Sequence, residues 1–473
     1  MSVLPDSFTT RMQQLLGDQF AAFEHSLQSP SPTSIRINSD KVKSIDSLED
    51  VPWAKNAYYL PQRPLFTADP LLHAGAYYVQ EASSMCLELA INQWIDSNKA
   101  LLALDLCAAP GGKSTHLRSI LSPDSCLVSN EVIKSRSHIL QENLSKWGHT
   151  NSVVTQSDAS RFKGLTSLFD LIVVDAPCSG EGLFRKDEEA IKEWSEDNCK
   201  LCEGRQMRIL EDILPALKDG GTIVYSTCTY NPLENELLVE KFTKANNLEI
   251  LRLDSPDIHN LTPKEAGGKI VGYQCYPHKI KGEGFFFAGL RKRGSDESSG
   301  YSKVKQNWIS NASKKATESL PVLFDGDDLG YYTIGDELTA FPQYWEDALH
   351  QLAAQVKVLQ AGCPVGSVIH GKFNPAAELA LSSRFLSKNF PSLELDLENA
   401  LAFLSRQDFD HGEAENGWNL ISYQQIPLGW IKKIGHRANN YWPTNWRIRM
   451  GMDELLEASI NNPSLPKLQT IKS

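Results

Sequence analysis

Leu104-Asp105-Leu106-Cys107-Ala108-Ala109-Pro110-Gly111-Gly112-Lys113-Ser114 passes from an apolar strand pattern into a glycine turn and then into a helix. In such a turn, backbone amides can closely approach a nucleotide-like ligand. A P-loop would require a glycine where Cys107 stands, and the dinucleotide-binding pattern G-x-G-x-x-G is also missing. The stretch therefore predicts an α/β fold whose cofactor carries no phosphate groups.

Apolar runs alternate with helical patterns around this turn. Six runs are expected to be strands: 101–106, 126–129, 152–156, 169–174, 221–226 and 284–290. Helical spacing occurs between them, at 135–147 and 188–217. The alternation predicts a Rossmann-like, doubly wound parallel sheet, which binds ligands beyond the carboxyl ends of its strands.

Length and composition indicate how many domains to expect and in which cellular compartment the protein lies. Because 473 residues exceed one hydrophobic core, we expect several parts. They are an N-terminal α/β extension at 1–95, the Rossmann-like domain at 96–292, a linker at 293–320, a middle module at 321–372 and a β-rich C-terminal domain at 373–473. Nine cysteines indicate reduced thiols. No stretch approaches the roughly 18 apolar residues of a membrane span, so we expect a cytoplasmic protein without membrane contact.

Two acidic residues follow the second and third expected strands. Glu131 lies 20 residues after Gly111, where an acid can accept hydrogen bonds from ribose hydroxyls, and Asp158 could face an adenine. With the glycine turn, they fit S-adenosylmethionine, which has a ribose, an adenine and a cationic sulfonium but no pyrophosphate. The alternative is that each acid only caps the helix after it.

Two cysteines follow the fourth and fifth strands, Cys178 in the sequence D-A-P-C and Cys228 in the sequence S-T-C-T. Both thiols are expected at one cleft. Carbon-5 of cytosine becomes nucleophilic only after a thiolate adds to C6, and a second group must then remove the C5 proton. Asp175 supplies an acid for the base edge, and Lys186 and Arg185 could lower a thiol pKa from about 8.5. The alternative is two buried, inert cysteines.

Several segments together carry a resemblance to a known family. They are 107–114, 130–132, 143–148, 175–184 and 225–236. This set resembles the NOL1/NOP2/Sun family of RNA 5-methylcytosine methyltransferases. The resemblance implies that Cys228 is the nucleophile and that Cys178 assists proton removal or product release, a choice that spacing alone leaves open.

The resemblance also implies which residues contact S-adenosylmethionine. They are Cys107, Ala108, Ala109, Pro110, Gly111, Gly112, Lys113, Glu131, Arg136, Asp158 and Asp175. Ser114 stands where the family often has threonine, which is a minor departure. We expect no metal site, because Cys199-x-x-Cys202 has no second pair at zinc-site spacing.

The C-terminal region is locally basic and aromatic. A net charge of −11 argues against a nucleic-acid partner for the whole surface, yet no acid occurs from 417 to 451. Cations that contact phosphates and aromatics that stack on bases interleave there. We expect RNA contacts from Lys432, Lys433, Arg437, Trp442 and Arg447. The region also resembles a PUA domain, and the alternative is an aromatic β core with solvated cations at its rim.

The sequence thus predicts an S-adenosylmethionine-dependent RNA cytosine-5 methyltransferase. Its C-terminal region resembles family members that act on 16S ribosomal RNA. We therefore expect a monomer that binds this RNA within the 30S subunit, with the extension at 1–95 as an RNA-binding wall of the cleft. One alternative is the same chemistry on transfer RNA or on another ribosomal cytosine. The other is a ribosome-assembly factor that binds RNA without catalysis, although such a factor needs no thiol pair.

Overall fold

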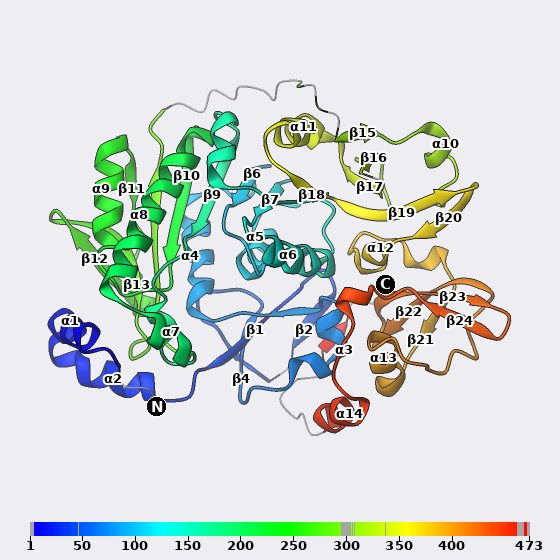
Figure 1. Cartoon of the computed structure of the whole chain (residues 1–473), viewed down its shortest axis with the longest axis horizontal. Helices are drawn as coiled ribbons and strands as arrows, with labels where there is room; N and C mark the ends of the chain where they lie inside the picture. The colour runs from blue at the N-terminus through cyan, green and yellow to red at the C-terminus, as the bar shows by residue number, and fades with distance from the viewer. Residues whose placement is uncertain are drawn as a thin grey trace.

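A ten-stranded sheet forms the centre of the molecule. The computed structural model describes residues 4–45, 47–294, 304, 306, 308–335, 337–460 and 468–470. Five strands of this sheet run parallel: β6 (Leu102–Asp105), β7 (Cys126–Asn130), β8 (Ser152–Thr155), β9 (Phe169–Asp175) and β10 (Leu217–Thr227). They lie in the order β8-β7-β6-β9-β10 (Figure 1). The doubly wound topology predicted from the sequence is therefore confirmed.

The direction of winding reverses between β6 and β9. β7 and β8 extend the sheet on one side of β6, whereas β9 and β10 extend it on the other. At such a switch point, the loops that follow the two central strands diverge and leave a crevice. The glycine turn after β6 and the two cysteine loops after β9 and β10 consequently meet at one edge of the sheet.

Antiparallel strands widen the sheet at both ends. Next to β10 lie β11 (Glu249–Leu251), β12 (Thr262–Ala266), β13 (Lys269–Cys275) and β14 (Phe285–Arg291). At the other end, β18 (Val358–Ala361) pairs with β8 and sets Val358 opposite Thr155. We expected 321–372 to be a separate module, but this part of it completes the central sheet. The physical reason is that β8 would otherwise leave its backbone groups without partners at an open edge.

Two hydrophobic cores cover the two faces of the sheet. Along β9, Ile172 and Val174 point into one core, and Leu171 and Val173 point into the other. The first core is covered by α8 (Glu196–Ile213) and α9 (Glu236–Asn246), and the second by α4 (Leu87–Trp94) and α5 (Gly112–Ile120). Each such buried side chain contributes about 1.5–3 kcal/mol. Burial on both faces explains why these strands are continuous apolar runs in the sequence.

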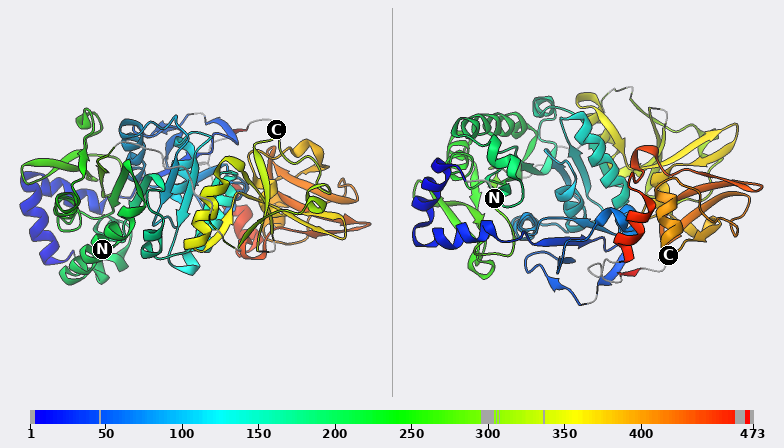
Figure 2. Two further views of the ribbon diagram at one scale, coloured as in Figure 1. Left: turned by 90° about the horizontal axis from the view of Figure 1, so that it is seen from above. Right: turned by 60° about the horizontal axis from the view of Figure 1, so that its bottom comes forward.

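The N-terminal extension combines a helical hairpin with a small sheet. α1 (Asp6–Leu16) and α2 (Phe20–Gln28) pack Phe8 and Phe23 against Phe184 and Tyr230, which lie in the loops after β9 and β10. Figures 1 and 2 show this hairpin beside the part of the molecule that contains α7 (Glu188–Glu193) and β13. The sheet has the order β3-β4-β1-β5. Its strands are β1 (Thr33–Ile37), β3 (Glu49–Asp50), β4 (Ala57–Leu60) and β5 (Tyr77–Val79).

Two further sheets make up most of the C-terminal half. The first contains β15 (Ile309–Asn311), β16 (Leu329–Ile334), β17 (Glu337–Pro342), β19 (Cys363–Ile369) and β20 (Lys372–Pro375). The second contains β21 (Ser392–Glu394), β22 (Gly417–Tyr423), β23 (Ile426–Ile434) and β24 (Arg437–Asn440). The expected β-rich character is confirmed. Of the linker expected at 293–320, residues 295–303, 305 and 307 lie outside the described residues.

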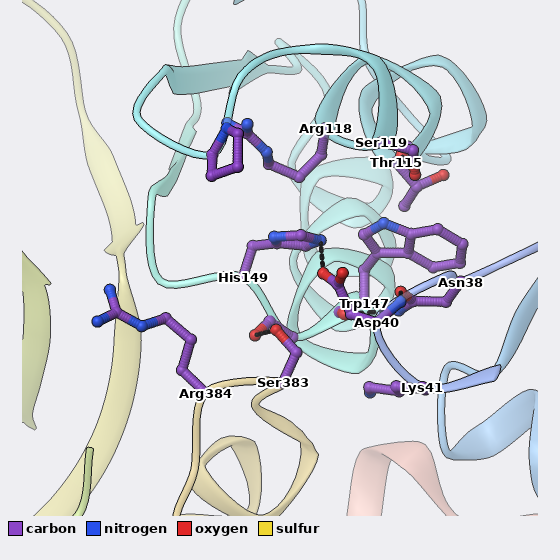
Figure 3. A network of polar contacts seen from close by, with 12 residues as sticks. Asn38, Asp40, Lys41, Thr115, Arg118, Ser119, Trp147, His149, Ser383 and Arg384 are labelled. Atoms are coloured by element: carbon purple, nitrogen blue, oxygen red, sulfur yellow. Dashed lines mark hydrogen bonds and ion pairs between the residues drawn. The ribbon is translucent and has the colours of Figure 1, made fainter. Parts of the chain in front are cut away.

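Side chains from three parts of the chain meet at the edge where the parallel strands begin (Figure 3). His149 Nε2 lies 3.3 Å from Asp40 Oδ2, and the Ser383 amide donates to the Gly148 carbonyl at 3.0 Å. Burial, and then the nearby cations, hold the pKa of His149 well below its ordinary value, so its ring faces Asp40 in the neutral form. A cleft of about 1230 Å³ lies beside it. Within the described ranges, every helix is too short or too polar to cross a membrane.

Candidate active site

The two cysteines predicted to share a cleft lie in contact. Cys178 Sγ and Cys228 Sγ are 3.1 Å apart, and both residues are half-buried. Their loops are joined by backbone hydrogen bonds, from the Ala176 amide to the Ser226 carbonyl at 2.9 Å and from the Gly182 amide to the Cys228 carbonyl at 2.8 Å. The hydrogen bond with the Cys228 thiol, and then burial, raise the pKa of Cys178 well above its ordinary value. Cys178 therefore retains its proton as long as its contact with the Cys228 sulfur persists.

An ion pair lies beside the thiols. Lys113 Nζ is 2.8 Å from Asp175 Oδ2, and the Ser226 hydroxyl donates to Asp175 Oδ1 at 2.8 Å. Burial alone would lower the pKa of Lys113, but Asp175, Asp105 and Cys228 outweigh it and raise that pKa. Lys113 is thus a permanent cation whose charge acts on the Cys228 sulfur.

The cations that we expected to influence the thiols face elsewhere. Arg185 donates to the backbone carbonyls of Ser29 at 3.0 Å and Pro30 at 2.6 Å, and Lys186 acts electrostatically on Glu283. Arg185 therefore fastens the N-terminal segment, and the cation that interacts electrostatically with Cys228 is Lys113. Lys113 was missed in this role because it belongs to the glycine turn, far from both cysteines in sequence.

The glycine turn is held in shape by the helix opposite. Arg136 donates to the Ala109 carbonyl at 2.7 Å, and Asn143 donates to the Pro110 carbonyl at 2.8 Å. The Ala109–Pro110 peptide is cis, and Gly111 has a φ of 118°, a conformation that favours glycine. The turn thereby begins α5 at the carboxyl end of β6.

Carboxylates outnumber cations beside the turn. Asp105 is fully buried, accepts from the Ser114 hydroxyl at 2.6 Å, and has an Oδ1 atom without a hydrogen-bond partner among the described residues. Burial raises its pKa to about 7, and Asp175 and Glu131 add to the effect. Such a cluster of carboxylates repels phosphates and fits a ligand with positive charge, because a buried carboxylate is stabilised by a cation.

Of the two acids expected at a cofactor, Asp158 caps the short helix that follows it, whereas Glu131 does not cap the next helix. Glu131 is buried, accepts from the Ile133 amide at 2.9 Å and lies 3.5 Å from an Arg136 nitrogen. Asp158 is exposed and accepts from the amide and hydroxyl of Ser160, which lowers its pKa. Glu131 belongs to the carboxylate cluster around Asp105, and Asp158 follows β8 at the same edge of the sheet.

The C-terminal residues expected to bind RNA divide into two groups. Trp442 is fully buried and packs its ring against Trp446 at 5.4 Å, so it presents no face to a base and that expectation is corrected. Lys433 Nζ donates to backbone carbonyls, including that of Ala414 at 2.7 Å, which gives it a structural role. Lys432, Arg437 and Arg447 retain exposure to solvent, and Lys432 Nζ lies 4.9 Å from the centre of the Trp418 ring. These last three remain candidates.

A buried acid between the cysteine loops was not anticipated. Glu234 accepts from the Ser179 amide, the Ser179 hydroxyl and the Gln206 amide group at 2.5–2.9 Å. The signal available in the sequence was the short polar run Glu234-Asn235-Glu236, which follows the second cysteine where a helix begins.

Known proteins resemble the chain over nearly its whole length. The model for 16S rRNA methyltransferase RsmB/F matches residues 92–291, that for the N-terminal domain of 16S rRNA methyltransferase RsmF matches 4–82, and that for the methyltransferase RsmF PUA domain matches 390–448. Ribosomal RNA small subunit methyltransferase F of Aeromonas salmonicida is 31% identical, covering 93% of this chain and 96% of that protein. Its counterpart in Erwinia tasmaniensis is 30% identical with the same coverage, 93% and 96%. A solved methyltransferase homologue from Pyrococcus horikoshii, 30% identical, covers 61% of this chain and 95% of its own with a TM-score of 0.52.

The fold and the site define a Rossmann-like methyltransferase with an N-terminal extension and a C-terminal PUA domain. The chain belongs to the RsmF family of methyltransferases. The resemblance to the NOL1/NOP2/Sun enzymes seen in the sequence is thereby confirmed, as is the enzyme class.

Proposed function

We propose that the chain transfers a methyl group from S-adenosylmethionine to carbon-5 of a cytosine in 16S ribosomal RNA. The observation that carries the proposal is the contact between Cys178 and Cys228, 3.1 Å apart beside the Lys113–Asp175 ion pair. Two half-buried thiols next to a fixed cation suit covalent addition to a base better than packing.

Cys228 is the nucleophile in this proposal. Its thiolate, stabilised by the positive charge of Lys113, forms a bond with C6 of the cytosine and leaves C5 nucleophilic. Asp175 is held by Lys113 and Ser226, where its oxygens can accept hydrogen bonds from N3–H and the amino group of the base. The base is thereby oriented with C6 toward one sulfur.

Cys178 receives the C5 proton. Its high pKa arises first from the contact with the Cys228 thiol, and that contact disappears once Cys228 is bonded to C6. Cys178 can then lose its thiol proton to solvent and act as a base. The proton moves from C5 to the Cys178 sulfur, the electrons of the C5–H bond re-form the C5–C6 double bond, and the S–C6 bond breaks with its electrons returning to Cys228.

The residues near the glycine turn fit a cationic cofactor. We assign contacts to Cys107, Ala108, Ala109, Pro110, Gly111, Gly112, Lys113, Glu131, Arg136, Asp158 and Asp175. The unpartnered Asp105 Oδ1 offers one further acceptor for a positively charged group. When bound, S-adenosylmethionine supplies an electrophilic methyl group at its sulfonium.

Two findings support ribosomal RNA as the substrate. The relatives that cover 93% of the chain are named as methyltransferases of small-subunit ribosomal RNA, and the PUA match includes Lys432, Arg437 and Arg447. We propose that the protein acts in the cytoplasm, as a monomer, on 16S RNA within the 30S subunit. The N-terminal extension forms one wall of the RNA cleft. Transfer RNA or another ribosomal cytosine is the second candidate, because the same thiol chemistry serves either.

The test compares the wild-type chain with Cys228→Ala, Cys178→Ala and a remote control, Cys363→Ala in β19. Each is incubated with labelled S-adenosylmethionine and unmethylated 30S subunits or deproteinised 16S RNA, and products are mapped by bisulfite sequencing. We expect label at one cytosine from the wild type and the control, none from Cys228→Ala, and a covalent RNA adduct from Cys178→Ala on denaturing gels. Undiminished methylation by Cys228→Ala would refute the nucleophile assignment. Cofactor binding without label on any RNA would favour an assembly factor.

A further inference from the structure

We infer that Glu234 and Asn235, two successive residues between β10 and α9, position the two thiols, with Glu234 holding Cys178 and Asn235 holding Cys228. The inference rests on the proposed function and assigns positioning residues to it. Both side chains are fully buried. Each holds the residues on both sides of one cysteine, Asn235 directly and Glu234 with the help of Gln206.

Glu234 fixes the loop that carries Cys178. Its Oε2 accepts from the amide of Ser179, the next residue, at 2.9 Å and from Gln206 Nε2 at 2.9 Å. The same Gln206 nitrogen donates to the carbonyl of Pro177, the preceding residue, at 3.0 Å. The peptide groups on both sides of Cys178 are therefore tied to a single carboxylate.

Asn235 holds the other cysteine in the same manner. Its Oδ1 accepts from the hydroxyl of Thr227 at 2.6 Å, and its Nδ2 donates to the carbonyl of Thr229 at 2.9 Å. These are the residues immediately before and after Cys228. An amide is required here, because the side chain must donate on one side of the cysteine and accept on the other.

A chain of hydroxyls joins the two loops. The Asn231 amide donates to Thr229 Oγ1 at 3.2 Å, and Thr229 Oγ1 lies 2.9 Å from Ser179 Oγ. Ser179 in turn donates to Glu234 Oε1 at 2.5 Å. Glu234 accepts three hydrogen bonds through its two oxygens, and these oppose the effect of burial, which raises its pKa. Glu234 therefore orients every hydroxyl in the chain toward itself.

The neighbouring residue provides a matched control. Glu236 is also buried but pairs with Lys264 at 2.9 Å, on the hairpin strand β12. Removing its charge perturbs the same short segment without touching either cysteine loop. A loss of activity that the Glu234 and Asn235 variants share with the Glu236 variant is therefore general destabilisation. A difference in activity between the Glu234 variant and the Asn235 variant reports instead on the positioning of the two cysteines.

The test measures covalent RNA adduct and methyl transfer for Glu234→Ala, Glu234→Gln, Asn235→Ala and Glu236→Gln. A displacement of about 1 Å reduces a step by about 10²-fold, so Glu234→Ala should release product about that much more slowly and accumulate adduct as Cys178→Ala does. Asn235→Ala should form no adduct, which is also the result expected for Cys228→Ala. Glu234→Gln should be partly rescued, since its amide oxygen can still accept from Ser179 and Gln206. Equal losses of adduct in both alanine variants, tracking the folded fraction, would overturn the inference.

A second measurement needs no RNA and separates this inference from the proposed function. Diamide accepts two electrons and two protons from a pair of thiols in contact, which leaves a disulfide and reduced diamide. The rate of Cys178–Cys228 cross-linking, read by thiol titration and peptide mapping, should fall at least about tenfold in Glu234→Ala and Asn235→Ala, as expected for thiols held less closely. It should be unchanged in Glu236→Gln. Unaltered cross-linking in the first two would contradict positioning even if the chain proves inactive on every RNA.

Discussion

Asp105→Asn tests the electrostatics of the carboxylate cluster beside the glycine turn. Asp105 is fully buried, and its pKa is raised from 3.8 to about 7, first by burial. The difference corresponds to about 4 kcal/mol between the two protonation states. Below the unfolded pKa of 3.8, both folded and unfolded chains hold the proton. As the pH rises from there to about 7, only the unfolded chain ionises freely, so the free energy of unfolding falls.

The assay is urea unfolding of the cofactor-free protein at pH 5 and pH 8. The asparagine side chain of the variant cannot ionise, so between these pH values the wild type should lose about 3 kcal/mol more stability than the variant. Other titrating groups are common to both proteins and cancel in the comparison. Equal pH dependence in the two proteins would refute the assignment of a raised pKa to Asp105.

The same variant has a consequence for the cofactor. A positively charged group beside Oδ1 favours the ionised carboxylate, so the affinity of the wild type for S-adenosylmethionine should rise between pH 5 and pH 8. Calorimetric titration of Asp105→Asn should show a weaker affinity with little of this rise. A variant that binds as tightly as the wild type at pH 8 would remove Asp105 from the cofactor site.

Three further outcomes are expected. Gly182→Ala places a Cβ 2.7 Å from the backbone oxygen of Cys228, so methyl transfer should fall by about 10²-fold. Gly204→Ala, with open space around it, should match the wild type in the same assay. Joint replacement of Lys432 and Arg437 by alanine should weaken RNA binding, measured by filter binding at several salt concentrations. The slope of log affinity against log salt should fall by about 0.7–0.9 for each phosphate that is no longer neutralised. An unchanged slope would exclude both side chains from binding the RNA phosphates. Trp442→Ala should cost about 3–5 kcal/mol in urea unfolding, while leaving the RNA affinity of the folded protein near that of the wild type.

The central sheet was predictable because its signals are local. Strands such as 169–174 are buried on both faces and therefore read as continuous apolar runs, and the glycine turn marks the change from strand to helix. The edge strand β18 was not predictable in the same way. Its four residues pair with β8, which lies about two hundred positions earlier in the chain. No pattern within the four residues indicates so distant a partner.

The C-terminal residues illustrate a different limit. Both Trp442 and Trp418 lie among cations in the sequence, yet one is fully buried and the other half-exposed. Which ring faces inward depends on how β23 pairs with its neighbours and on what covers the sheet. Lys433 likewise reads as a surface cation, but its ammonium group satisfies backbone carbonyls. Composition identified the region correctly, whereas only packing distinguishes a contact residue from a core residue.

The meeting of the two thiols follows from the parallel pairing of β9 and β10. Ser226 lies opposite Asp175 in that pairing, so each cysteine emerges only two or three residues beyond the same level of the sheet. A shift of one residue would move one loop by about 3.3 Å along the strand, which is as large as the 3.1 Å contact itself. The antiparallel alternative would send the cysteines to opposite ends. The pairing of β9 and β10 therefore fixes the position of each cysteine along its strand to within about one residue. Side chains such as Glu234 and Asn235 are needed to bring the two sulfurs from there into contact.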